Sequence, residues 1–136
     1  MSERSTEEVF LDHLKKRKEG AIEEDIHENY ARDAIFLTGL GVLRGHDGAR
    51  YLARRFENRL PLANVDYNTK LVFGDVAFLE WTADSDLAVV RDGAESLQIR
   101  GGKIVIHTIH YTVEPLRKKS VEAAEDKVIE FDSRRR

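Results

Sequence analysis

The sequence contains no cysteine, and this absence excludes disulfides, a thiolate nucleophile and a zinc–thiolate site. It has no excess of basic residues either: 22 Lys and Arg stand against 25 Asp and Glu, and a formal net charge of -3 argues against generic nucleic-acid binding. No apolar run approaches the length that spans a bilayer, and the charged N-terminus lacks the apolar core of a signal peptide. These absences predict a cytoplasmic protein with neither nucleic acid nor membrane as a partner.

The period of the apolar residues changes along the chain. Helical spacing comes first and predicts helices over about residues 6–19, 21–32 and 45–60, with Pro61 ending the third. A short hairpin formed by Ala34–Thr38 and Val42–Arg44 separates the second helix from the third. Alternating runs then predict strands, at Asp66–Phe73, Val76–Ala83 and Leu87–Val90.

The best-defined strand pair is the hairpin Asp92–Val113, where Gly101 and Gly102 can supply the positive φ of a tight turn. Side chains alternate between the faces of a strand. The second strand of the hairpin therefore has two faces, one with Val105, His107, Ile109 and Tyr111 and the other with Ile104, Ile106, Thr108 and His110. Because both faces are largely apolar, we expect either a fully enclosed core, or helices and a pocket on one face and a homodimer contact on the outer face.

Helices followed by a run of long strands predict a single α+β domain over residues 1–115. Residues 116–136 form a charged C-terminal tail with an apolar stripe at helical spacing, made by Val121, Ala124, Val128 and Phe131. Two interpretations of this tail stay open, a frayed amphipathic helix and a helix docked on a partner subunit.

Three short motifs resemble the nuclear-transport-factor-2-like superfamily, in its SnoaL-like (polyketide cyclase-like) and ketosteroid isomerase-like branch: Asn29–Ala34, Leu43–Gly48 and Gly102–Ile104. The resemblance implies a cone-shaped half barrel, in which three N-terminal helices cover a curved antiparallel sheet. It also implies a pocket between sheet and helices and dimerisation through the sheet. Members include isomerases, dehydratases, cyclases and binding modules without catalysis, so this fold does not select one function.

The resemblance also implies where an isomerase would place its reacting groups, and the chain departs from that pattern at two of three positions. The general-base carboxylate would follow the first short strand, where this chain has Thr38. The tyrosine of the first helix corresponds to Leu14. The protonated carboxylic acid maps near Glu95, so only this position keeps a carboxyl group. Dienol chemistry with Thr38 as base is therefore not expected.

Glu95 and His107 are the candidate catalytic residues. Glu95 shares a strand face with Leu97, an apolar setting that raises the pKa of a carboxyl group, although a solvated or structural Glu95 is the alternative. His107 is predicted to face the same pocket and to form a His–Glu dyad across the hairpin. Glu80 joins them if its side chain points inward. If Trp81 points inward instead, Glu80 lies on the outer face, and a single β-bulge is enough to switch between the two arrangements.

Two functions remain open from the sequence. One is a cofactor-independent isomerase, cyclase or lyase that uses Glu95 and His107 in acid–base chemistry on a small apolar or aromatic molecule. The other is a non-catalytic ligand-binding or dimerisation module. The histidines show no metal-ligand spacing, so neither hypothesis includes a metal ion or a cofactor. The residues expected to shape the cavity and bind the substrate are Tyr30, Thr38, Glu80, Leu97, Ile109 and Tyr111.

Overall fold

A computed structural model describes residues 3–116, and the apolar stripe of the tail lies outside these residues. The elements are α1 (Thr6–Lys18), α2 (Ile22–Asn29), β1 (Tyr30–Thr38), β2 (Gly41–Arg44), α3 (Gly45–Arg59), β3 (Asn64–Phe73), β4 (Val76–Asp84), β5 (Ala88–Arg100), β6 (Lys103–His110) and β7 (Glu114–Pro115). Across residues 3–116, no helix combines the length and the hydropathy that crossing a membrane requires.

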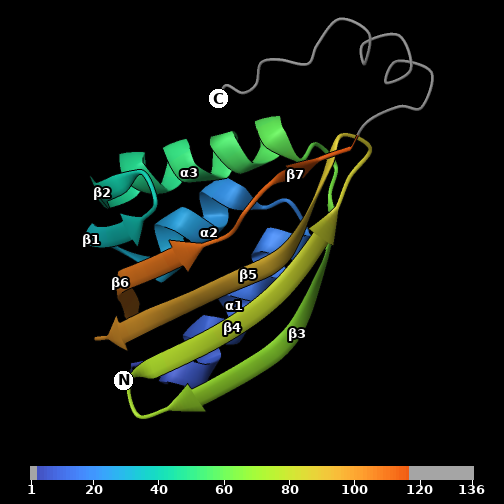
Figure 1. Ribbon diagram of the computed structural model, residues 1–136. Coiled ribbons are helices and arrows are strands. Elements are labelled where there is room, and N and C mark those ends of the chain that lie inside the picture. The colour runs from blue at the N-terminus through green and yellow to red at the C-terminus, as the bar shows by residue number, and fades with distance from the viewer. Residues whose placement is uncertain (1–2, 117–136) are drawn as a thin grey trace, which may run out of the picture.

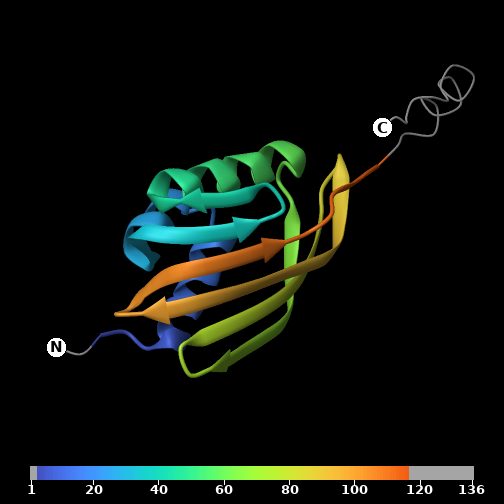
Figure 2. The ribbon, with the colours of Figure 1, turned by 60° about the vertical axis from the view of Figure 1, so that its left-hand side comes forward.

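The strands form one curved sheet in the order β2-β1-β6-β5-β4-β3, with β7 paired to β5. The three helices lie on one face of this sheet (Figures 1 and 2). Helix α1 packs against β3, β4 and β5, α2 against β1 and β6, and α3 against β1 and β2. The predicted α+β half barrel is confirmed, but the sheet is mixed rather than wholly antiparallel, because β1 runs parallel to β6.

Helix α1 begins at a capping box, in which the Ser5 side chain accepts a hydrogen bond from the Glu8 backbone N–H and Glu8 accepts one from the Ser5 backbone N–H. Helix α2 ends at Asn29, earlier than the predicted end near residue 32. Tyr30 is therefore the first residue of β1 and pairs with Ile104 of β6. Lys103 donates to the Glu28 carbonyl and so satisfies one acceptor in the last turn of α2.

The hairpin of β5 and β6 is confirmed, with Gly101 and Gly102 at φ of 59° and 72° in its turn. The predicted assignment of β6 side chains to the two sheet faces is wrong at Ile104. Ile99 pairs with Ile104 while Gln98 pairs with Ile106, so β6 carries one extra residue at this point, a β-bulge. The bulge turns Ile104 into the core, where it is fully buried, and leaves Ile106 on the outer face at 37% exposure.

Of the two orientations considered for β4, the structure has the one in which Trp81 points inward and Glu80 outward. Trp81 points into the core at 4% exposure, and Glu80 is exposed on the outer face. Glu80 therefore cannot join Glu95 in a common cavity, as the inward alternative required. The predicted strand Leu87–Val90 is also not separate, because β5 extends without interruption from Ala88 to Arg100.

The indole of Trp81 lies directly over Gly93 of the neighbouring strand. The two residues are cross-strand partners, and a Cβ atom built on Gly93 would stand 2.3 Å from the Trp81 ring. Only glycine leaves room for the indole here, because core side chains already pack at the density of organic crystals.

Replacing Gly93 by Ala should displace the Trp81 ring and lower the free energy of unfolding by about 1–3 kcal/mol, the usual cost of overpacking. The control is Gly39→Ala, since a Cβ on Gly39 meets nothing within 4 Å. Urea titrations followed by the fluorescence of Trp81, the single tryptophan of the chain, report both effects. Equal stabilities for the two variants would contradict this account of the glycine.

Candidate functional site

The structure brings Glu95 and His107 together on the helix-covered face of the sheet. Each comes from one strand of the β5–β6 hairpin, at positions whose side chains point the same way. His107 Nε2 lies 2.7 Å from Glu95 Oε1, and the two side chains are 4% and 14% exposed. On its other side, His107 Nδ1 lies 2.8 Å from the hydroxyl of buried Tyr30. A continuous hydrogen-bonded chain therefore runs from Tyr30 through His107 to Glu95.

A second polar network lies between α1 and α2. The fully buried carboxylate of Asp25 accepts hydrogen bonds from His13 Nδ1 at 2.9 Å, Arg17 Nε at 2.7 Å and Asn29 Nδ2 at 2.8 Å. His13 and Arg17 are four residues apart on α1, and Asp25 and Asn29 are four apart on α2, so each pair shares one helix face. The network therefore joins the two helices through their buried faces.

The two networks meet at the histidines. The rings of His13 and His107 pack edge to face with centroids 5.7 Å apart. Ligand-type atoms of His13, Glu95 and His107 all lie within 4.8 Å of one another. Because Asp25 holds Nδ1 of His13, the nitrogen that remains for contacts with Glu95 is Nε2.

The pKa shifts assign the protons in the chain from Tyr30 to Glu95. Burial raises the pKa of Glu95, but the hydrogen bond from His107 and the nearby His13 and Arg17 outweigh burial, and the pKa is lowered overall. Burial, with the nearby His13 and Arg17, also lowers the pKa of His107, although Glu95 acts in the opposite direction. Burial raises the pKa of Tyr30 far above its usual range. A neutral His107 thus accepts from the Tyr30 hydroxyl and donates from Nε2 to an ionised Glu95.

Asp25 is ionised as well. Burial disfavours its charge, but His13, Arg17 and Asn29 together hold the pKa of Asp25 well below its usual range. Arg17 is 23% exposed and its guanidinium stays charged beside this carboxylate. The helix network thus pairs the buried negative charge of Asp25 with the partly exposed positive charge of Arg17.

An aromatic cluster lies on the same sheet face as Glu95. Trp81 pairs with Gly93, two residues before Glu95, and contacts Phe56 and Tyr111 with ring centroids 5.7 Å and 5.4 Å away. Burial raises the pKa of Tyr111. Trp81 Nε1 is buried and has no hydrogen-bond partner among residues 3–116. The aromatic cluster thus combines a largely apolar surface with one unused donor.

The other residues predicted to line the pocket do not gather around Glu95 and His107 in one place. Thr38 belongs to the β1–β2 turn, where its hydroxyl donates to the Gly41 carbonyl and accepts from the Leu40 N–H. Leu97 is fully buried in the core, while Ile109 is partly buried beside it. Tyr30 lies behind His107 and touches the site through that ring. Leu14 is a core residue, and the polar group that α1 directs toward Glu95 is His13.

His13, Arg17, Asp25 and Asn29 were not predicted as site residues. One local signal was present, since His13 interrupts the apolar stripe of α1 and Asp25 lies beside Ile26 on α2. Polar residues in an apolar stripe indicate a buried network. The meeting of His13 with a histidine 94 positions later depends on tertiary packing, and spacing along the chain carries no sign of it.

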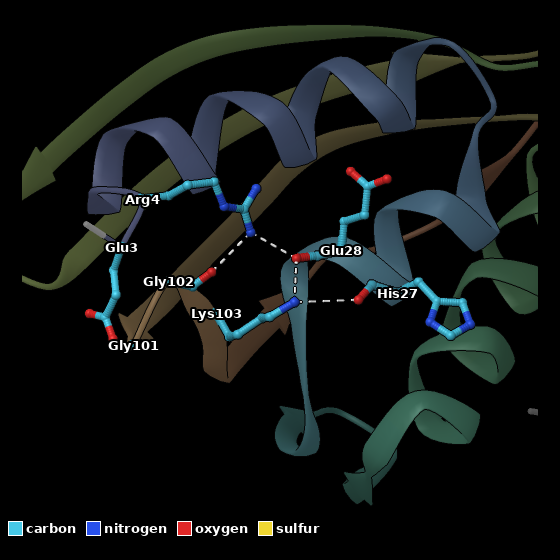
Figure 3. Close-up of a pocket in the computed structure, with 7 residues that line it drawn as sticks. All are labelled: Glu3, Arg4, His27, Glu28, Gly101, Gly102 and Lys103. Carbon is cyan, nitrogen blue, oxygen red and sulfur yellow. Dashed lines mark hydrogen bonds between the residues drawn. The ribbon is translucent and has the colours of Figure 1, made fainter. Parts of the chain in front are cut away.

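Two hollows of the described chain differ in their relation to this cluster, because Glu95 lines only the smaller one. The larger, about 590 Å³, is shown in Figure 3 between the β5–β6 turn and the end of α2. There Arg4 and Lys103 both donate to the Glu28 carbonyl, so their charges serve to tie the chain segments together. The smaller, about 450 Å³, is lined by residues of the outer sheet face such as Phe78 and Thr108, and also by Glu95 and by the predicted pocket residues Thr38 and Ile109. Neither hollow is lined by His13 or His107.

Known structures resemble this fold. IdmH, a candidate polyketide cyclase from Streptomyces antibioticus, matches with a TM-score of 0.67 and 14% identity over 92% of this chain and 100% of its own. A candidate ketosteroid isomerase from Kribbella flavida matches with a TM-score of 0.64 and 17% identity, over 93% and 88%. A de novo designed protein with a curved β-sheet matches with a TM-score of 0.66 and 19% identity, over 94% and 100%.

No protein-family model matches the sequence, and a search of curated proteins finds no significant relative. At 14–19% identity the structural matches show the fold alone. The chain has the nuclear-transport-factor-2-like fold found in SnoaL-like polyketide cyclases and in ketosteroid isomerase-like proteins.

Proposed function

We propose that the protein is a cofactor-independent acid–base enzyme that acts on a small apolar or aromatic molecule, with Glu95 as the group that exchanges a proton with the substrate. The observation that carries this proposal is the chain of hydrogen bonds from Tyr30 through His107 to Glu95. General acid–base catalysis needs a correctly placed proton acceptor, and these hydrogen bonds support that role by holding the Glu95 carboxylate in one orientation.

His107 acts in this proposal as a positioning residue. It donates to Oε1 of Glu95, so Oε2 is the oxygen that takes a proton from the substrate. Transfer of that proton to another atom of the same molecule completes an isomerisation and returns Glu95 to its ionised form. His107 holds the carboxylate in place through both steps, because Tyr30 fixes the opposite edge of its ring.

The substrate class follows from the surroundings of Glu95. Phe56 and Tyr111 are partly buried aromatic residues on the same face of the sheet, and both pack against the buried Trp81. The names of the structural neighbours, a candidate polyketide cyclase and a candidate ketosteroid isomerase, agree with ring-bearing substrates of this kind.

A non-catalytic binding module is the second candidate. The observation that favours it is the structure at the two isomerase positions, because Thr38 is held in a turn and Leu14 is core. The fold then supplies a hydrophobic site, and Glu95 serves as a polar anchor for the ligand.

Replacing Glu95 by Gln keeps the acceptor for His107 and removes the ionisable group. We expect turnover of any substrate found by screening to fall by roughly two to four orders of magnitude, the usual reach of general acid–base catalysis. Glu80→Gln is the matched control, since Glu80 lies exposed on the outer face two strands from His107. Turnover of Glu95→Gln within about threefold of wild type would show that Glu95 is not the proton-exchanging group, whereas the binding module predicts that wild type turns over none of the molecules it binds.

We also propose a homodimer through the outer face of the sheet. Ile104 does not contribute to it, but Ile106 and Leu37 remain 37% and 44% exposed there. Contiguous apolar side chains on an exposed surface mark interaction sites, and the commonest soluble oligomer is a two-fold dimer of one chain.

Ile106→Lys should convert the dimer to a monomer, because it places a charge in the middle of the outer sheet face. Leu87→Lys is the control, since Leu87 is also an exposed apolar residue, at 54%, but lies in the β4–β5 loop away from that face. Size-exclusion chromatography with light scattering distinguishes one chain of 15.6 kDa from two. A wild-type protein that is monomeric at micromolar concentration would contradict the dimer.

A further inference from the structure

Three side chains that can ligate a metal converge on the helix-covered face of the sheet. His13 reaches it from α1, Glu95 from β5 and His107 from β6, and their ligand-type atoms lie within 4.8 Å of one another. Ligand bonds of about 2.0–2.2 Å place the donor atoms of a tetrahedral ion roughly 3.3–3.5 Å apart. Small side-chain rotations therefore bring the three groups onto one ion.

The groups behind the two histidines are already in the positions that a metal site needs. Metal-binding histidines usually donate their second ring N–H to a carboxylate or another oxygen, which fixes the ring and its tautomer. Nδ1 of His13 is bonded to the Asp25 carboxylate, and Nδ1 of His107 lies 2.8 Å from the Tyr30 hydroxyl. Both Nε2 atoms are thereby left to face Glu95.

We propose that His13 Nε2, His107 Nε2 and a Glu95 oxygen bind one divalent first-row transition-metal ion of the Zn²⁺ class. Two imidazoles and one carboxylate are the ligand set that such ions favour. The partial exposure of Glu95 supplies an entry path and a direction for further ligands. On binding, His107 donates from Nδ1 to Tyr30, so this hydrogen bond keeps its partners and reverses its direction.

Bound metal would regulate the proposed enzyme. Only this effect on turnover rests on the proposed function; metal binding itself does not. An ion on Glu95 occupies the carboxylate that would otherwise take the substrate proton. Zn²⁺ should therefore inhibit metal-free acid–base turnover, and a chelator should restore it. Binding itself is measured without any substrate.

The test uses the full chain without an affinity tag, freed of metal by chelation, and titrates it with Zn²⁺ by calorimetry and with Co²⁺ by visible absorption. We expect one ion per chain and the d–d bands of a Co²⁺ ion with nitrogen and oxygen ligands. His13→Asn keeps a donor close to the position of Nδ1, and so keeps Asp25 paired, but lacks Nε2. It should weaken binding by more than about 100-fold, since loss of an outer partner alone typically costs 10- to 100-fold.

Glu95→Gln is a second variant, which keeps the hydrogen bond from His107 but loses the charged ligand; it should also weaken binding. His110→Asn is the matched control, because His110 lies on β6 with its side chain 71% exposed on the outer face. Circular dichroism melts verify that each variant is folded.

The metal site is refuted if wild type binds no stoichiometric ion, or if folded His13→Asn and Glu95→Gln bind as tightly as wild type. Loss of turnover in Glu95→Gln without metal binding by wild type would refute the metal site and leave the acid–base proposal intact.

Discussion

The buried carboxylate of Asp25 is the constraint around which the helical layer is arranged. An ionised group without water needs partners for its charge, and three side chains of α1 and α2 supply them. His13 and Arg17 belong to α1, so their bonds to Asp25 hold α1 against α2, while Asn29 supports the carboxylate from its own helix. The same packing turns the free edge of the His13 ring toward the sheet.

The sheet meets this layer with a second set of bonds. His107 joins Tyr30, the first residue of β1, to Glu95 of β5, so one imidazole ties together three neighbouring strands. The ring also contacts His13. Helices and sheet therefore meet at the site through two histidine rings, in addition to the apolar core around Phe10, Phe36 and Leu97.

What the sequence predicted correctly follows from local rules. Alternation along a hairpin placed Glu95 and His107 on one face, and the structure has them 2.7 Å apart. The same alternation rule failed at Ile104, because one extra residue in β6 moves the Ile104 side chain to the other face of the sheet. Strand periodicity in the sequence does not reveal such a bulge. Tyr30 was expected in a helix and is a strand residue, because pairing with β6 decides its backbone. The network of Asp25 joins segments whose contact only the folded chain determines.

The fold alone does not explain this polar cluster. A designed protein with a curved sheet has similar architecture, so the half barrel can form without a natural function to serve. Buried ionic networks are also costly, since apolar residues of similar volume often stabilise a protein equally well or better. Here His13, Asp25, Tyr30 and His107 are all buried. The bonds of Tyr30 and His107 lead to Glu95, a carboxylate that keeps contact with solvent, and the His13 ring packs against His107 beside it. Stability does not require that convergence, whereas chemistry or ligation at Glu95 does, because both need a carboxylate held in one orientation.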